Sequence, residues 1–284
     1  MELKTITVKD LYMKYFGGYL GVDMVSFDVN NESLAVYGKA MSGKTSLLRC
    51  IANLEKYEGQ IYTNAKDLVF SFDLDSLKKN KTVKDNISIP LKLRKIPNID
   101  EIVLNKAKIF HIDDILDKKI KDITFSQKRL TILTRAFVRD ADLYLLDNPL
   151  KDVEDREKYF EILKEEIKDK FVVYATDSLE EAKAFNKVLL MAYKKGIAFG
   201  NINDMLKEPK TIDVLKLLTD YEYENVTLEK DNDKYCIKYL NKIYNVPEPI
   251  NNIYVGKEVV FSRDKDIILD MYFDKSTEYL ISKR

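Results

Sequence analysis

The feature that most constrains this chain is Gly38–Thr45, with the sequence GKAMSGKT, which fits the pattern G-x-x-x-x-G-K-[ST]. The apolar run Leu34–Tyr37 before it predicts a buried strand, and Leu47, Leu48 and Ile51 after it have helical spacing. A strand, a glycine-containing loop and a helix in this order present backbone N–H groups and a positive helix end to an anion. A chance match is the competing interpretation, expected in about 1 in 100 chains of this length at average glycine usage. It is less common still here, because the chain has only 9 glycines.

The pattern assigns roles to individual side chains. Lys44 is predicted to reach the outer phosphates of a nucleotide, and the Thr45 hydroxyl to bind Mg²⁺. The apolar run Leu143–Leu146 ends in Asp147, which is predicted as the second Mg²⁺ anchor; an ordinary carboxylate at a strand end is the alternative. The other loop residues predicted to surround the phosphates are Gly38, Lys39, Ala40, Met41, Ser42 and Gly43.

The order of apolar segments predicts an α/β fold. Near-continuous apolar strands alternating with helices indicate a parallel sheet covered on both faces. Residues 3–9 and 22–29 instead alternate apolar and polar side chains, as half-buried antiparallel strands do, so the sheet structure is mixed. The buried strands are expected at 34–37, 68–71, 143–147, 171–175 and 187–191.

Two segments depart from this alternation. Residues 72–122 are charged and more helical, which predicts an inserted helical lobe within a domain covering 1–215. Past residue 215 short strands follow one another, which predicts a small β domain over 216–284. Its expected strands are 226–228 and 235–237, paired as a hairpin, followed by 258–261 and 267–269.

Composition excludes several classes of function. Lys plus Arg equals Asp plus Glu at 47 each, so no broad basic surface for nucleic acid is expected. No apolar run is long enough to cross a bilayer, and the first residues lack the apolar core of a signal peptide. Cys50 and Cys236 lie far apart and are expected to be reduced thiols. The single histidine, His111, argues against a histidine-based metal site or a Ser-His-Asp triad.

The order of elements, together with two further stretches, resembles the ATP-binding subunits of ABC transporters over essentially the whole chain. These stretches are TVKDNISIPLKLRKIP and KKGIAFGNINDMLKEP, and GKEVVFSRDKDIIL resembles part of the OB-like β domain of carbohydrate-importer ATPases. The resemblance implies a P-loop NTPase fold, ATP and Mg²⁺ as cofactors, permease partners and a peripheral place at the cytoplasmic face of the membrane. It also implies that Tyr15, or its neighbour Phe16, stacks on adenine.

Three positions differ from that family where it acts on the γ-phosphate. The family's Glu after the metal-binding aspartate orients or deprotonates the attacking water, and here it is Asn148, whose amide can position water but cannot accept its proton. The family's strand-end Gln is replaced by Ser71, whose hydroxyl has a shorter reach. Its switch His is replaced by Asp177, and a carboxylate there would repel a γ-phosphate.

The family's Leu-Ser-Gly-Gly-Gln signature, which faces the nucleotide of a partner subunit, appears as Ile123–Gln127. Thr124 keeps a hydroxyl and Gln127 is retained, so both are assigned to nucleotide contact; Thr124 is also predicted to cap a helix. Phe125 and Ser126 replace two glycines, and the ring is expected to obstruct close approach. Met41 likewise adds bulk where the phosphate loop of the family usually has glycine.

These differences lead to a hypothesis with an alternative. The chain is expected to bind ATP·Mg, to hydrolyse it weakly or not at all, and to pair with a different, intact ATPase subunit beside the permease of a sugar importer. The alternative is an active motor that works as a homodimer. Ile87, Ile89 and Leu91 in the helical lobe are candidates for permease contact, with core packing as the alternative. An ABC ATPase of translation or DNA repair is disfavoured by the single P-loop, and a small-molecule kinase by the β appendage.

Overall fold

The computed structural model describes residues 3–71, 73–207, 209–220, 223–231, 234–239, 242–246 and 258–262. It separates into two compact units, residues 1–202 and 203–284, which are described here one at a time. The domain boundary expected at 215/216 stays a prediction. No helix of the described residues is both long and apolar enough to cross a membrane.

The centre of the first unit is a six-stranded sheet in the order β5-β6-β7-β3-β8-β9. Its strands are β3 (Leu34–Tyr37), β5 (Leu68–Ser71), β6 (Leu143–Asp147), β7 (Val172–Thr176), β8 (Lys187–Ala192) and β9 (Lys195–Gly200). The first five run parallel and β9 is antiparallel to β8. Every residue of β3 and β7 is buried, as a sheet covered on both faces requires. The predicted α/β fold with a mixed sheet is confirmed.

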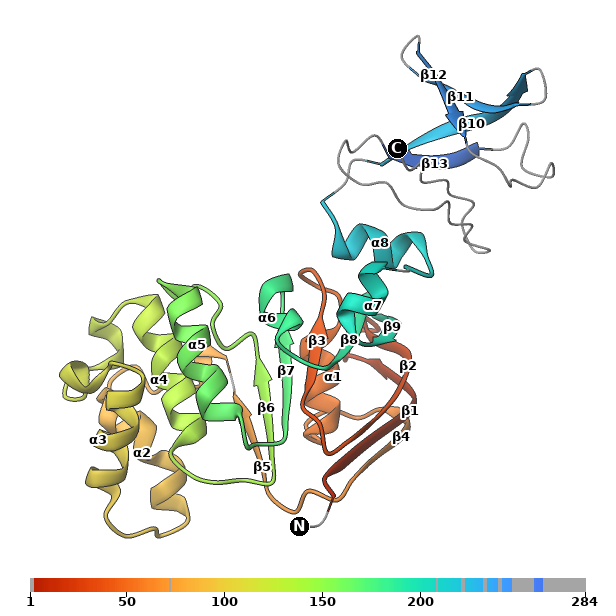
Figure 1. Cartoon of the computed structure of the whole chain (residues 1–284). Helices are drawn as coiled ribbons and strands as arrows, with labels where there is room; N and C mark the ends of the chain where they lie inside the picture. The colour runs from red at the N-terminus through yellow and green to blue at the C-terminus, as the bar shows by residue number, and fades with distance from the viewer. Residues whose placement is uncertain are drawn as a thin grey trace. The chain divides into compact units, whose positions relative to one another are not determined.

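A second sheet of three antiparallel strands, in the order β2-β1-β4, packs against helix α1 (Lys44–Ile51). Its strands are β1 (Thr5–Lys14), β2 (Leu20–Asn30) and β4 (Glu58–Thr63). Leu47 and Leu48 of α1 share one apolar core with side chains from both sheets, and α1 lies between the sheets (Figure 1). Cys50 of α1 is a free, buried thiol, and burial raises its pKa to about 12. This core fixes the start of α1 against the sheet edge.

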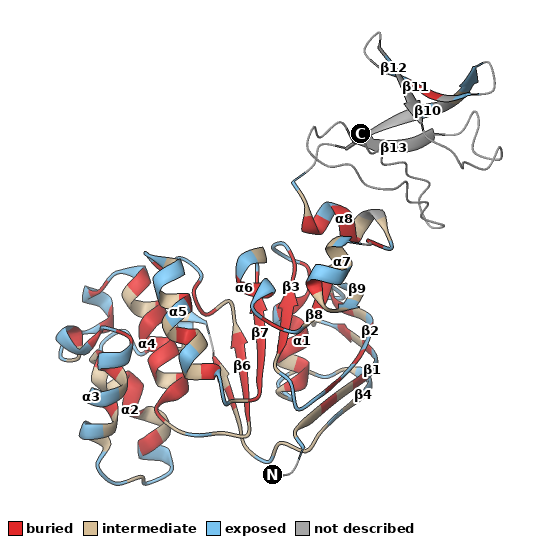
Figure 2. Cartoon of the chain, viewed as in Figure 1, coloured by how far each residue is buried: buried red, intermediate tan, exposed pale blue. Residues whose placement is uncertain are grey.

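The helices predicted for residues 72–122 are present. They are η1 (Leu74–Ser76), α2 (Val83–Leu93), α3 (Ile99–Ile109), η2 (Asp113–Ile115) and η3 (Ile120–Asp122). Together with α4 (Phe125–Phe137) and α5 (Arg156–Ile167) they lie on one side of the central sheet (Figure 1). Ile87 and Leu91 are buried, so core packing holds for these two candidates. The red inner faces of α2 and α4 in Figure 2 show the same packing.

The remaining elements are short helices and a small sheet. The helices are α6 (Leu179–Lys183), α7 (Ile202–Lys207) and α8 (Ile212–Leu218). The second unit has an antiparallel sheet in the order β12-β11-β10-β13, made of β10 (Tyr223–Asp231), β11 (Lys234–Tyr239), β12 (Lys242–Val246) and β13 (Glu258–Ser262). The predicted hairpin is the β10–β11 pair. The strand expected at 267–269 lies outside the described residues, and the OB-like assignment stays a prediction.

Candidate functional site

The loop between β3 and α1 is held so closely that glycine is needed at two of its positions. At Gly38, a Cβ would lie 2.3 Å from the carbonyl oxygen of Met191, and at Gly43 it would lie 2.8 Å from that of Gly21. Gly43 also has φ +108°, a conformation that disfavours other residues. The Gly38 N–H donates to the Thr176 carbonyl over 3.3 Å, which ties the loop to β7. The result is a compact backbone cradle of the kind that binds phosphate groups.

Lys44 is the first residue of α1 and its side chain is turned back onto this loop. It is 5% exposed, and its Nζ donates to the carbonyl oxygens of Gly38 at 2.6 Å and Lys39 at 2.9 Å. Burial lowers the pKa of Lys44, while the negative charges of Asp177 and Asp147 oppose that shift. The ammonium group therefore lies inside the cradle, with carbonyl acceptors that phosphate oxygens can replace by stronger, charge-assisted bonds.

The two residues predicted to hold Mg²⁺ lie together. Asp147 ends β6, and a hydrogen bond from the Thr45 side chain and the charge of Lys44 both lower the pKa of its carboxyl. Burial has the larger effect, so the pKa of Asp147 is raised overall. Hydroxyl and carboxylate oxygens are ligands that Mg²⁺ accepts, and a divalent cation would offset the cost of the buried charge. The donor set thus fits the metal.

Asn148, which follows Asp147, carries a buried oxygen that has no hydrogen-bond partner in the described part of the chain. Its backbone has φ +42°, and its N–H donates to the Ala175 carbonyl at 2.9 Å. The amide Nδ2 lies 3.4 Å from Asp147 Oδ1, whereas Oδ1 of Asn148 is buried with no hydrogen-bond partner among the described residues. An orphaned acceptor of this kind is what an ordered water satisfies, but an amide cannot take up that water's proton.

The side chains of Ser71 and Asp177 are both engaged within the protein. Ser71 Oγ, at the end of β5, accepts the N–H of Asp147 over 2.8 Å. Asp177 forms an ion pair with Arg156, 3.0 Å between Oδ1 and the guanidinium nitrogen. Sequence reasoning missed Arg156, because nothing in its spacing relates the start of α5 to the end of β7.

The two candidate adenine-stacking rings point differently. Tyr15 is partly buried against the core, and its hydroxyl lies 2.9 Å from Ser46 Oγ on α1. Phe16 is fully exposed. The structure therefore gives Phe16, rather than Tyr15, a ring with both faces free for stacking.

The signature-like segment caps its own helix. Thr124 Oγ1 accepts the Gln127 N–H at 3.2 Å, and Gln127 Oε1 accepts the Thr124 N–H at 3.0 Å. This is a capping box, so the predicted N-cap is confirmed. Ser126 is buried and accepts the Glu154 N–H at 3.1 Å, whereas Phe125 is 67% exposed, with Lys128 Nζ 5.0 Å from its ring centre. The contacts found for Thr124 and Gln127 in the described chain stay within their own helix, and none joins them to the phosphate loop.

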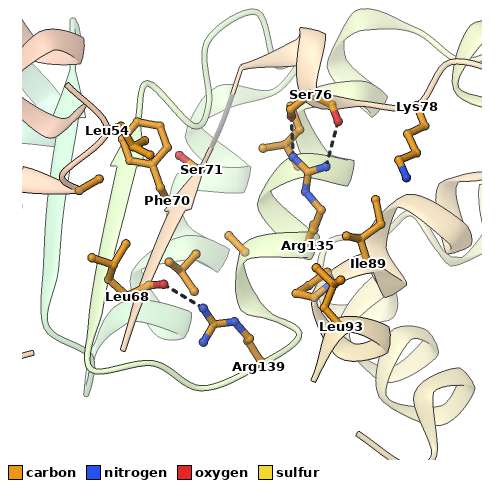
Figure 3. A pocket seen from close by; sticks show the side chains of 15 residues that line it. Leu54, Leu68, Phe70, Ser71, Ser76, Lys78, Ile89, Leu93, Arg135 and Arg139 are labelled. Atoms are coloured by element: carbon orange, nitrogen blue, oxygen red, sulfur yellow. Dashed lines mark hydrogen bonds between the residues drawn. The ribbon is translucent and has the colours of Figure 1, made fainter. Parts of the chain in front are cut away.

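An apolar groove of about 550 Å³ lies between β5 and helices α2 and α4. Figure 3 shows Leu54 beside Phe70 at one end and Ile89 beside Leu93 at the other. Arg139 donates to the Leu68 carbonyl at 2.8 Å, and Arg135 to Ser76 Oγ at 2.6 Å. Ser71 also lines this groove, so one residue contacts both the groove and, through its hydroxyl, the backbone of Asp147.

Comparison with known proteins accords with this geometry. Residues 22–151 match the model of the ABC transporter family. The chain is 33% identical to the trehalose/maltose import ATP-binding protein MalK of Thermococcus litoralis, over 50% of this chain and 43% of that protein. It is 26% identical to the oligosaccharides import ATP-binding protein MsmX of Bacillus subtilis, over 98% of this chain and 84% of that protein.

A third relative is the sn-glycerol-3-phosphate import ATP-binding protein UgpC of Rhizobium meliloti, 30% identical over 54% of this chain and 48% of that protein. The match thus spans less than half of MalK and UgpC, and most of MsmX. The phosphate loop, the paired Thr45 and Asp147, and the matched family model lead to one conclusion: residues 22–151 carry an ATP-binding domain similar to those of the ABC transporter family.

Proposed function

We propose that this chain is a nucleotide-binding subunit of an ABC importer for a carbohydrate, which binds ATP·Mg but hydrolyses it weakly or not at all. One observation carries the proposal. The groups that hold phosphate and metal, Lys44, Thr45 and Asp147, lie together, whereas the position of the water-activating carboxylate is occupied by Asn148.

The chemistry follows from these side chains. Bound ATP·Mg supplies a terminal phosphoryl group open to attack by water. Lys44 would bind its outer oxygens, Thr45 and Asp147 would hold the metal, and the loop amides from Gly38 to Gly43 would surround the phosphates. Asn148 can accept a hydrogen bond from water through Oδ1, which has no partner among the described residues, but it cannot remove the proton. A missing general base lowers the rate by about 10²–10⁴-fold.

The partner of the chain would then be a second ATPase subunit with an intact base. In ABC dimers each nucleotide lies between the phosphate loop of one chain and the signature of the other. A homodimer of this chain would combine Asn148 with the altered segment that carries the exposed Phe125 at both sites. A mixed pair would keep one site whose base comes from the other subunit.

Membrane attachment would come through permease subunits on the cytoplasmic side, with no nucleic acid involved. The apolar groove lined by Phe70, Ile89 and Leu93 is the surface we assign to that contact. Ser71 would connect it to the metal site through its bond to Asp147. The names of MalK, MsmX and UgpC all describe import, which supports an importer. Two of them, MalK and MsmX, are named for carbohydrates, which supports a carbohydrate cargo.

The alternative is an active homodimeric motor, because Lys44, Thr45 and Asp147 suit hydrolysis as well as binding. ATP turnover by the purified chain alone decides between the two. The proposal predicts saturable ATP binding with little phosphate release. Turnover by the chain alone that disappears in Lys44→Ala would establish the motor instead.

Pairing is tested by co-expression of the chain with the permease and ATPase genes of one importer. The proposal predicts recovery of a complex that contains this chain and a second ATPase in equal amounts. Recovery of a self-paired, fully active assembly would contradict it.

A further inference from the structure

A cluster of charged side chains lies beyond the end of β7, and Arg156 is at its centre. Arg156, the first residue of α5, holds Glu181 with two bonds, Nε to Oε1 at 2.6 Å and a terminal nitrogen to Oε2 at 3.0 Å. Glu181 is 3% exposed, and the Tyr174 hydroxyl also donates to it at 3.0 Å. The same terminal nitrogen of Arg156 reaches Asp177 Oδ1 at 3.0 Å. One guanidinium therefore joins a buried carboxylate to a half-exposed one.

The half-exposed carboxylate lies next to the phosphate loop. Thr176 pairs with Tyr37 in the parallel sheet, and its carbonyl accepts the Gly38 N–H, so Asp177 follows directly where β7 meets the loop. The charge of Asp177 also acts on Lys44, whose pKa it raises against the effect of burial. An unpaired carboxylate at this place would repel the charge of a bound triphosphate.

We propose that Arg156 is a positioning residue that holds Asp177 in an ion pair and thereby lets a triphosphate bind beside a carboxylate. This inference rests on the proposed ATP binding and adds a residue that determines the preference for binding ATP over ADP. The planar guanidinium suits the role, because its fork can bond two carboxylates at once. Its bidentate contact with buried Glu181 fixes the fork before any nucleotide arrives, so Asp177 is held at little further cost in side-chain entropy.

The test is the ratio of ATP to ADP affinity, measured by calorimetry with Mg²⁺ on the full chain and its Arg156→Gln, Asp177→Asn and double variants. Loss of Arg156 frees the Asp177 charge, which opposes the additional phosphate of ATP, so Arg156→Gln should lower the ratio roughly tenfold. Adding Asp177→Asn to that variant should restore the ratio to within about twofold of the parent chain, whereas Asp177→Asn alone should change it by only about twofold.

Two results would overturn the role of Arg156. One is equal weakening of ATP and ADP in Arg156→Gln, which a purely structural residue would give. The other is the same change of ratio by Asp177→Asn whether or not Arg156 is present, which would mean that the two charges act independently.

Folding needs its own control, because Arg156→Gln leaves buried Glu181 without its cation. Arg156→Lys keeps that charge but loses the fork, and it should lower the ratio in the same direction by a smaller factor; an unchanged ratio in a folded Arg156→Lys chain would contradict the proposal. No ATP binding by the parent chain would overturn the proposed function itself, whereas tight binding with unchanged ratios in the variants overturns only the role of Arg156.

Discussion

The loop after β3 and the ends of β5, β6 and β7 lie at one edge of the same sheet. They differ in which of the residues expected for ATP binding and hydrolysis they carry. The loop holds Lys44 inside a glycine-built cradle, and Thr45 meets Asp147. At the strand ends, we propose that Ser71, Asn148 and Asp177 stand where the family has the groups that act on the γ-phosphate, and all three side chains bond within the protein. Holding a triphosphate depends mainly on backbone and one cation, whereas cleaving it depends on individual side chains, so one ability can persist without the other.

The largest expected effect is on ATP affinity, at the phosphate loop. Lys44→Ala removes the cation that faces the outer phosphates, and truncating one partner of a buried charge pair should weaken ATP binding about 100-fold. Calorimetry with ATP and Mg²⁺ measures it. The control is Lys106→Ala, which removes a lysine of α3 that forms an ion pair with Glu166 of α5. It should leave the ATP affinity unchanged. Equal ATP affinities in Lys44→Ala and the parent chain would contradict the assignment of ATP binding to the phosphate loop.

The next largest expected effect is on ATP turnover, at the end of β6. Asn148→Glu supplies a general base and should raise ATP turnover about tenfold or more, short of the full gain because Ser71 and Asp177 remain. Phosphate release under saturating ATP measures it. Asn148→Gln, which lengthens the side chain but keeps an amide, should give no gain. A flat response to Asn148→Glu with ATP binding intact would show that the amide is not what limits hydrolysis.

A smaller effect separates the two aromatic neighbours. Phe16→Ala should weaken ATP binding about fivefold through loss of a stacking face, because Phe16 is exposed. Tyr15→Phe removes only a hydroxyl bonded to Ser46 and should stay close to the parent affinity. Fluorescent-nucleotide displacement compares the two. Loss of affinity in Tyr15→Phe but not in Phe16→Ala would reverse the assignment.

The smallest effect concerns the signature-like segment. Thr124→Ala removes one half of the capping box with Gln127 and should lower the free energy of unfolding by about 1 kcal/mol, measured by urea denaturation. Thr124→Ser keeps the hydroxyl and should restore most of the stability. A Thr124→Ala chain as stable as its parent would show that the cap contributes nothing.

Sequence reasoning succeeded where local pattern decides the outcome. The apolar runs 34–37, 68–71 and 143–147 are β3, β5 and β6 with the expected bounds, since a turn residue or a charged residue directly precedes each run. Thr124 caps α4 as predicted, because a hydroxyl followed by Gln three residues later is a local signal.

It could not decide what depends on distant partners. Two adjacent rings are expected to point to opposite sides, but the pattern does not say that Tyr15 faces Ser46 and Phe16 faces solvent. Helical spacing in 82–97 places Ile87 and Leu91 on one face without saying that α4 covers it. The Arg156–Asp177 pair joins α5 to the end of β7, and no sequence spacing encodes that contact.

The most direct test of the separation between holding and cleaving is a single preparation of the parent chain assayed twice, once for binding of ATP·Mg and once for release of phosphate. The account predicts saturable binding that Lys44→Ala weakens about 100-fold, with phosphate release at least about tenfold slower than in Asn148→Glu. Absence of binding, or release by the parent chain as fast as in Asn148→Glu, would contradict it.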